Sequence, residues 1–115
     1  MVITEVRASV LAARLFHGFA DSTRVAILLE LLDGERRVGD LVERVGSSQS
    51  NVSGHLACLK GCGLVVDRPG PRRQVFYRLA GPEVANLLVA AERLLAATGT
   101  AVELCRNPLM GDTDG

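Results

Sequence analysis

Apolar residues recur at helical spacing through the first half of the chain and predict a series of helices. The first covers residues 4–19. The second begins at Asp21-Ser22-Thr23, because such side chains accept hydrogen bonds from the free amides of a first helical turn. This second segment is apolar almost all round, so we expect a central helix that stops at Asp33-Gly34. A short helix over Val38–Val45 follows, and Gly46 ends it.

The stretch Ser47–Gly63 predicts the helix around which the chain is organised, with Ser47 or Ser48 as its cap. At about 100° per residue, one apolar stripe would seat this helix on a core: Val52, Leu56 and Leu59. Small side chains on another side would let the helix approach something large: Ser50, Ser53, Gly54 and Ala57. A third ridge carries polar groups and thiols: Asn51, His55, Cys58 and Cys62.

After Gly63 the pattern changes from helical to alternating. Leu64-Val65-Val66 and Val75–Leu79 read as strands, and the segment 67–73 between them contains two prolines and a glycine. This segment predicts a β-hairpin with arginines at its tip. A helix then begins near Gly81-Pro82 and runs to about Ala97.

These elements predict a mainly α-helical fold with a small β-hairpin. A short helix, a glycine turn and a second helix with an outward polar face form the helix-turn-helix pattern, and the hairpin is the wing of a winged helix-turn-helix. We expect one DNA-binding and dimerisation domain over residues 1–99. Residues 100–115 are expected to form a C-terminal tail that carries Cys105.

Composition supports one helical domain, and the charge distribution indicates a partner. The chain has 115 residues, of which 48% are hydrophobic, with three Phe, one Tyr and no Trp, so Leu, Val and Ala must fill a modest core. Its net charge is zero, but residues 47–78 hold five basic residues against Asp67, a balance of +4. A basic segment on an acidic body suits contact with phosphates. A solvated charged loop is the simpler alternative.

The sequence also indicates a compartment. No stretch resembles a signal peptide or approaches the roughly 18 apolar residues of a membrane span, so we expect a cytoplasmic protein without a membrane partner. An odd number of cysteines, three, is poor material for a disulfide framework there. Free or metal-bound thiols are the better interpretation.

Cys58 and Cys62 are four residues apart, which places their Cβ atoms on adjacent helical turns about 5–6 Å from each other. Two thiolates leave a shared ion under-coordinated, and Cys105 is the other cysteine of the chain. Three thiolates would favour Cd(II) or Pb(II), with As(III) next and Zn(II) acceptable. The alternatives are that the cysteines are small buried apolar residues or that they form a redox pair.

Residues at the start of the predicted recognition helix are candidates for contact with DNA. Gln and Asn side chains can pair bidentately with adenine, and Ser serves bases or phosphates. The candidates are Ser48, Gln49, Ser50, Asn51, Ser53 and His55. Arg72 and Arg73 at the wing tip would contact phosphates or the minor groove, where they position the protein more than they specify a sequence. For His55 a packing role is the alternative, and for the arginines it is solvent exposure.

The assembled motifs resemble the ArsR/SmtB family of metal-responsive winged-helix repressors. The resemblance covers roughly residues 10–97 and is carried by five segments: 19–24, Val38–Val45, 48–56, 63–65 and the wing through Tyr77. It implies a homodimer, formed through the first and last helices, that binds an operator with two-fold symmetry. Because the thiols lie along the flank of the predicted recognition helix, our hypothesis is that the apo dimer represses and that metal binding releases it.

The position of the cysteines agrees with one branch of this family. Family sites on the helix before the recognition helix use clustered cysteines, and Val38–Val45 has none. Family sites on the last helix use histidines and carboxylates, and Pro82–Ala97 offers only Glu83 and Glu92, with no histidine. Cys58, Cys62 and Cys105 remain, which resembles the family's cadmium and lead sensors, whose ligands are two cysteines on the recognition helix and one in the tail.

Three other functions compete with this hypothesis. A thiol-redox or arsenite-sensing repressor would use the same cysteines. A thiol enzyme with a small-molecule substrate is disfavoured, because the spacing is CxxxC and neither an acid–base constellation nor a phosphate loop accompanies it. A purely structural dimer would leave the basic segment 47–78 without a purpose. We therefore expect a regulator and not an enzyme.

Overall fold

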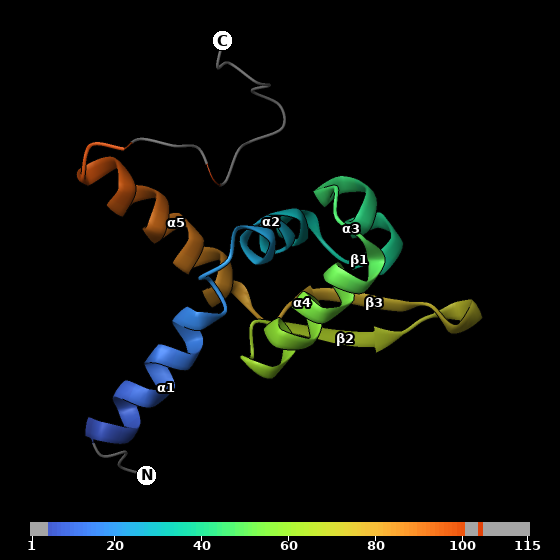
Figure 1. Ribbon diagram of the computed structural model, residues 1–115, viewed down its shortest axis with the longest axis horizontal. Coiled ribbons are helices and arrows are strands. Elements are labelled where there is room, and N and C mark those ends of the chain that lie inside the picture. The colour runs from blue at the N-terminus through green and yellow to red at the C-terminus, as the bar shows by residue number, and fades with distance from the viewer. Residues whose placement is uncertain (1–4, 101–103, 105–115) are drawn as a thin grey trace. The chain divides into compact units, whose positions relative to one another are not determined.

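The computed structural model describes residues 5–100 and residue 104, and it divides into two compact units, Met1–Ala80 and Gly81–Gly115. Figure 1 shows the elements of each unit. In the first unit they are α1 (Glu5–His17), α2 (Ser22–Glu30), η1 (Leu31–Asp33), β1 (Arg36–Arg37), α3 (Val38–Val45), α4 (Gln49–Gly61), β2 (Val65–Pro69), η2 (Pro71–Arg73) and β3 (Val75–Leu79). In the second unit the structure describes α5 (Pro82–Ala97).

The predicted capping signals determine where the central helices begin and end. Asp21 caps α2, because its Oδ1 accepts from the backbone amides of Thr23 and Arg24 at 2.8 and 3.1 Å. Gly46 ends α3 with φ of +77°, a left-handed conformation that glycine adopts at little cost. Ser48 then caps α4 by accepting from the Asn51 amide at 3.1 Å. The tight α3–turn–α4 arrangement is thus encoded locally.

The core of the first unit lies where α2, α3, α4 and the sheet meet. The predicted stripe of α4 is fully buried, and Ile27 and Leu28 confirm the central position of α2. The core residues of this unit are Ile27, Leu28, Leu31, Leu41, Val52, Leu56, Leu59, Leu64 and Val65. Burial of such side chains stabilises a fold by roughly 1.5–3 kcal/mol each. Packing therefore fixes which ridges of α4 remain outside.

The sheet differs from the predicted two-stranded hairpin. It has three antiparallel strands in the order β1-β3-β2, with Arg36 opposite Tyr77 and Arg68 opposite Phe76. The prediction missed β1, because two consecutive arginines carry no alternating pattern. It also ended the first hairpin strand too early, since β2 continues to Pro69. The loop is correspondingly tighter, and the α3–α4 pair followed by this hairpin is the predicted winged helix-turn-helix (Figure 1).

Of the two flanking helices, α5 has its predicted range, whereas α1 ends at His17 and so is shorter than the predicted 4–19. α1 exposes large apolar side chains: Val10, Leu11 and Phe16. α5 begins with Pro82 at its first turn, as predicted, and exposes Leu94 and Leu95. In the second unit the amide of Leu104 donates to Glu92 Oε2 at 2.7 Å. Among the described residues, no helix is both long and apolar enough to cross a membrane. The proposed division into a domain over 1–99 and a tail over 100–115 stays a prediction.

Candidate functional site

The N-terminal end of α4 presents the predicted DNA-contacting residues to solvent. Ser48, Gln49, Ser50, Asn51 and Ser53 are all exposed. Several of them also hold one another in place: Asn51 Nδ2 donates to Ser47 Oγ at 2.6 Å, and the hydroxyl oxygens of Ser48 and Ser50 lie 3.4 Å apart. The exposed polar groups are thus preorganised at the end of the helix, while their contacts with DNA stay a prediction.

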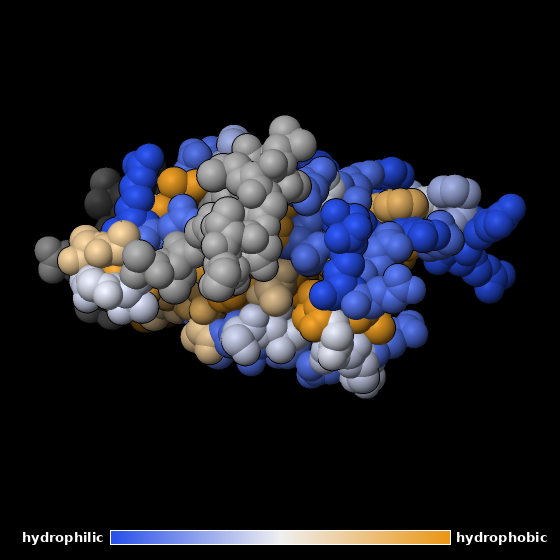
Figure 2. Space-filling model, turned by 90° about the horizontal axis from the view of Figure 1, so that it is seen from above, coloured by the Kyte–Doolittle hydropathy of each residue, from blue (hydrophilic) through white to orange (hydrophobic). Residues whose placement is uncertain are grey.

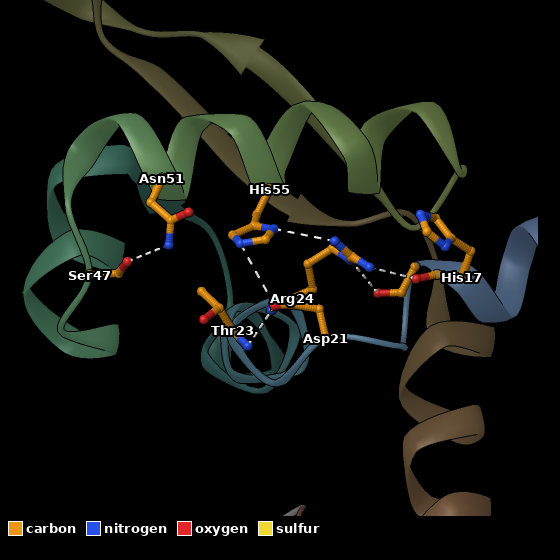
Figure 3. A network of polar contacts seen from close by, with 8 residues as sticks. His17, Asp21, Thr23, Arg24, Ser47, Asn51 and His55 are labelled. Carbon is orange, nitrogen blue, oxygen red and sulfur yellow. Dashed lines mark hydrogen bonds and ion pairs between the residues drawn. The ribbon is translucent and has the colours of Figure 1, made fainter.

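His55 lies one turn further along α4 and is turned toward α2. Its Nδ1 lies 3.4 Å from Nη1 of Arg24, and its Nε2 lies 3.7 Å from Oδ1 of Asp21 (Figure 3). The His55 side chain is 17% exposed. These contacts give His55 the packing role that the sequence left as the alternative, and its role at DNA stays a prediction.

Arg24 is the centre of this polar network. It is a buried arginine, and its guanidinium donates to the backbone oxygens of His17 at 2.8 Å and Gly18 at 3.2 Å (Figure 3). A buried guanidinium must have all its donors engaged, or the free energy of folding is reduced. Arg24 therefore links the α1–α2 junction to α4 through His55.

The wing tip carries the two predicted arginines in an unusual conformation. Arg72 and Arg73 are exposed, and their φ angles of +60° and +61° are both left-handed. A residue with a Cβ atom adopts this conformation at a cost of roughly 1–2 kcal/mol. Figure 2 shows hydrophilic side chains gathered at the end of the molecule formed by this hairpin. The strain is consistent with a site where the direction of the side chains matters.

A groove separates the wing from the helix-turn-helix. Its volume is about 490 Å³, and α3, the first residue of α4 and the wing all contribute to its wall. The cations that line it are Arg37 and Arg73, and the carboxylates are Asp40 and Glu43. Arg37 donates to Asp40 at 3.2 and 3.1 Å. The contact lowers the pKa of the Asp40 carboxyl, and the carboxylate compensates the positive charge of Arg37.

The basic segment 47–78 is less positive at its surface than its composition implies. Lys60 pairs with Asp67 at 3.0 Å, and Arg68 pairs with Glu35. Two of the five cations are therefore already compensated, and Arg72 and Arg73 at the tip carry more of the segment's effective charge.

Cys58 lies on the flank of α4, on the same ridge as His55, and Cys62 is the residue directly after the helix, whose amide donates to the carbonyl of Cys58 at 3.0 Å. Both are free thiols and both are half-buried. Cys62 packs near the α1–α2 junction: a Cβ atom added at Gly18 would lie 3.6 Å from the Cβ atom of Cys62. Burial raises the pKa of the Cys62 thiol, and the neighbouring Cys58 raises it further. The positive charges of Arg24 and Arg14 oppose this rise but do not reverse it.

The thiol pair supplies two soft donors to a metal ion. Within residues 5–100 and 104, no group of three or more His, Cys, Asp or Glu side chains is placed to hold one. Cys105, the predicted third ligand, lies outside the described residues. The donors that the structure does place together suit a thiophilic ion, and completion of the site requires a ligand from elsewhere.

The sequence prediction missed the network around Arg24. Asp21 was identified only as a cap, and neither it nor Arg24 was connected with His55. The reason is distance along the chain, since 31 residues separate Arg24 from His55. One signal pointed to a buried arginine: Arg24 lies in the first turn of a helix that continues as an almost entirely apolar run.

Comparison with known proteins places this architecture in a family. A family model described as "Bacterial regulatory protein, arsR family" matches residues 21–66. The HTH-type transcriptional regulator CmtR of Mycobacterium tuberculosis is 45% identical over 100 residues, which are 87% of this chain and 83% of that protein. A Streptomyces lividans protein named "Probable mercury resistance operon repressor" is 40% identical over 93 residues, 81% of this chain and 74% of its own. Both relatives are named as regulators of transcription.

A solved structure agrees with the sequence relatives. It is the solution NMR structure of a homodimeric winged helix-turn-helix DNA-binding domain from Mycobacterium bovis, described as a possible ArsR-family regulator. The TM-score is 0.68 at 34% identity, and the match covers 82% of this chain and 93% of that one. The chain belongs to the arsR family of bacterial regulatory proteins, with α3, α4 and the β2–β3 hairpin as its winged helix-turn-helix.

Proposed function

We propose that this chain is a homodimeric repressor that binds operator DNA in its apo form and releases it when Cd(II) or Pb(II) binds cysteine thiolates. The observation that carries the proposal is the position of Cys58 on α4 and of Cys62 at its C-cap, because the exposed N-terminal end of the same helix is the DNA-reading candidate. One helix thus serves the operator and the signal ion. Reciprocity requires that DNA weaken metal binding as much as metal weakens DNA binding.

The DNA-binding part of the proposal rests on the exposed polar residues of α4 and on the wing. Gln49 and Asn51 are the residues suited to pair with adenine, and Arg72 and Arg73 are suited to the DNA backbone or minor groove. The remaining candidates, Ser48, Ser50 and Ser53, would serve bases or phosphates. Operator DNA is thus the proposed partner, and no catalysis is proposed.

The homodimer is supported by apolar side chains that each unit leaves exposed. Phe16 on α1 is 57% exposed and Leu94 on α5 is 66% exposed, both unusual for large apolar residues. A homologous domain is described as a homodimer in solution. We therefore propose that these two helices form the dimer interface, which would bury both side chains.

The metal-sensing part of the proposal rests on the thiol pair and on the named relatives. Cys58 and Cys62 supply two soft donors, Cys105 is the proposed third ligand, and As(III) or Zn(II) remain candidate ions. One similar protein is named for a mercury resistance operon, which is a thiophilic metal system. Whether Cys105 belongs to the site at all is an outcome of the titration described below.

The test begins with a duplex selected by the reduced, metal-free protein from a random-sequence library. The affinity for this duplex is then measured by fluorescence anisotropy at one fixed salt concentration, with and without saturating Cd(II) or Pb(II). We expect the metal to weaken binding by about tenfold or more, within the usual range of allosteric coupling. Unchanged affinity in the presence of bound metal would overturn the proposed mechanism.

The ligands are identified by titrating each single Cys→Ser variant with Cd(II) and following thiolate-to-metal absorption. We expect Cys58→Ser, Cys62→Ser and Cys105→Ser each to weaken metal binding and to abolish release of DNA. Gly61→Ser is the matched control, because it changes an exposed residue at the end of α4 away from the DNA-reading candidates without removing a thiol. A normal response from Cys105→Ser would remove the tail from the site.

A thiol-redox repressor is the alternative, and it would use the two free thiols that lie one helical turn apart. The raised pKa of the Cys62 thiol argues against it, because the thiolate is the form that reacts. A disulfide between residues four apart would strain a regular helix, which argues against it. Mass spectrometry after mild peroxide treatment separates the two functions. A reversible Cys58–Cys62 disulfide that weakens DNA binding, together with indifference to Cd(II), would establish the alternative.

A further inference from the structure

Glu35 and Arg68 form a bidentate ion pair between the body of the fold and the wing. Arg68 Nε donates to Glu35 Oε2 and Arg68 Nη2 donates to Glu35 Oε1, both at 2.7 Å. Glu35 directly precedes β1, whereas Arg68 lies in β2. The contact lowers the pKa of Glu35 and raises the pKa of Arg68, so both groups keep their charges. Exposed ion pairs usually contribute little, but two parallel hydrogen bonds in fork geometry are the exception.

The pair crosses the central strand of the sheet. The strand order is β1-β3-β2, so a contact from the start of β1 to β2 must pass over β3. Arg68 is opposite Phe76 on β3, and directly opposed side chains share one face of a sheet. The guanidinium carbon of Arg68 lies 4.7 Å from the centroid of the Phe76 ring, within the range of a cation–π contact. The pair therefore ties the two outer strands together above an aromatic ring.

Phe76 in turn supports the base of the wing tip. A Cβ atom added at Gly70 would clash with Cε1 of Phe76, so the ring packs directly against the Gly70 backbone. Gly70 N–H donates to the carbonyl of Gln74 at 2.7 Å, which closes the tip around Arg72 and Arg73. A continuous series of contacts thus runs from Glu35 through Arg68, Phe76 and Gly70 to the strained arginines.

We propose that Glu35 is a positioning residue for DNA binding, which holds the wing so that Arg72 and Arg73 keep a fixed orientation. The proposal rests on the function proposed above and adds an acidic residue to its DNA-binding machinery. Coulomb repulsion opposes this role, because a carboxylate beside a DNA-binding surface repels phosphates. Loss of the Glu35 charge therefore has opposite effects under the two explanations: charge alone predicts tighter DNA binding, and wing positioning predicts weaker binding.

The variant Glu35→Gln separates the two, since it removes the charge and keeps the size of the side chain. Glu43→Gln is the matched control, because Glu43 is likewise an exposed carboxylate and it lies in the wall of the groove beside the wing. On one random-sequence duplex, we expect Glu35→Gln to bind roughly threefold more weakly than the parent. We expect the control to bind equally or more tightly. Tighter binding by Glu35→Gln would overturn the proposal.

The salt dependence of binding gives a second readout on the same duplex. Each phosphate contact contributes about −0.9 to the slope of log affinity against log salt. If the wing arginines lose their fixed contacts, Glu35→Gln has a shallower slope than the parent, by about one contact. A slope that is unchanged or steeper would mean that the arginines still bind, and the proposal would fail.

A measurement without DNA keeps this proposal independent of the proposed function. Backbone order parameters of the Gly70, Arg72, Arg73 and Gln74 amides are measured by ¹⁵N relaxation in the apo protein. Rigid backbone has order parameters of about 0.85. We expect Glu35→Gln to reduce the wing-tip order parameters toward about 0.6 and Glu43→Gln to leave them unchanged. In an Arg68→Gln background, Glu35→Gln is expected to cause no further loss. A rigid tip in Glu35→Gln would refute the positioning role even if the protein binds DNA as proposed.

The two failures are thereby distinguishable. A parent protein that binds no duplex at all refutes the proposed function, and the order parameters still decide whether Glu35 holds the wing. A parent that binds DNA and releases it with metal, but whose wing is indifferent to Glu35→Gln, retains the proposed function and loses only this inference.

Discussion

Arg24 and His55 join the first turn of α2 to the middle of α4, with Nη1 of Arg24 3.4 Å from Nδ1 of His55. The other ring nitrogen of His55, Nε2, faces Oδ1 of Asp21 at 3.7 Å. The same guanidinium holds the carbonyls at the end of α1. The position of α4 relative to the α1–α2 junction therefore depends on one buried arginine, Arg24.

Substitution Arg24→Lys is expected to destabilise the protein although it preserves the charge. A lysine ammonium cannot reach the carbonyls of His17 and Gly18 and the ring of His55 in the same fork geometry. The loss of hydrogen bonds by buried groups predicts a reduction of about 1–3 kcal/mol in the free energy of unfolding. Urea denaturation measures it.

Arg44→Lys is the control for this prediction. Arg44 makes an exposed ion pair with Glu30 at 3.4 Å, and such pairs contribute at most about 1 kcal/mol. Equal destabilisation by the two substitutions would show that the network around Arg24 is no more important than a surface pair.

Asp21 predicts a dependence of stability on acid pH. Its pKa is lowered below 3.8, first by the backbone hydrogen bond from Arg24 and also by the charge of His55. Because the folded-state pKa is depressed, this stabilisation is present above the unfolded-state pKa and is lost as the pH falls through the folded-state value. Asp21→Asn lacks this titration. The stability difference between parent and variant should therefore shrink below about pH 4, and parallel acid denaturation curves would contradict the assignment.

The left-handed arginines predict that stability and DNA binding respond differently to glycine. Arg73→Gly relieves the strain at φ of +61° but adds freedom to the unfolded chain, so the free energy of unfolding should rise by at most about 1 kcal/mol. DNA affinity should fall, because a cation at the tip is lost. Gln74→Gly serves as the comparison, since Gln74 has an extended backbone and its replacement by glycine relieves no left-handed strain. Thermal unfolding and anisotropy measure the two effects, and a clear loss of stability in Arg73→Gly would argue against the strain.

Local signals explain which parts of the fold were predicted. α3 and β3 have the predicted bounds, because Gly46 and the alternating run Val75–Leu79 act within a few residues. The contacts that position the functional surface are instead long-range: 33 residues separate Glu35 from Arg68. No periodicity in either segment specifies such a partner. β1 escaped prediction for the same reason, since its two arginines become a strand only because β3 is there to pair with them.

The candidate site was predictable to the extent that it lies on one helix. The spacing of Cys58 and Cys62 placed both thiols on one ridge, and the structure confirms that this ridge lies off the buried stripe. The strain at Arg72 and Arg73 had no signal, because arginine carries no preference for a left-handed backbone. Sequence spacing thus located the chemical groups but not the contacts that fix their direction.

Gly54 provides a test of whether α4 is the helix that approaches DNA. It lies in the interior of α4, is exposed, and an added Cβ atom would meet nothing within 4 Å. Glycine in a helix interior reduces stability by roughly 0.5–1 kcal/mol relative to alanine. Gly54→Ala should therefore raise the free energy of unfolding by about that amount. If the small-residue side of α4 lies against DNA, the added methyl group should at the same time weaken binding.

Gly61→Ala is the matched control for this last prediction. Gly61 is also on α4, is exposed and has open space around its Cα atom, but it lies at the opposite end from the exposed polar residues. Its replacement should stabilise the protein, by less than at Gly54 because helix ends contribute less, and leave DNA affinity unchanged. Anisotropy titrations of both variants on the selected duplex give the comparison. Undiminished affinity in Gly54→Ala would mean that a side chain on this face meets no DNA, because stabilisation of the helix alone can only favour the bound form.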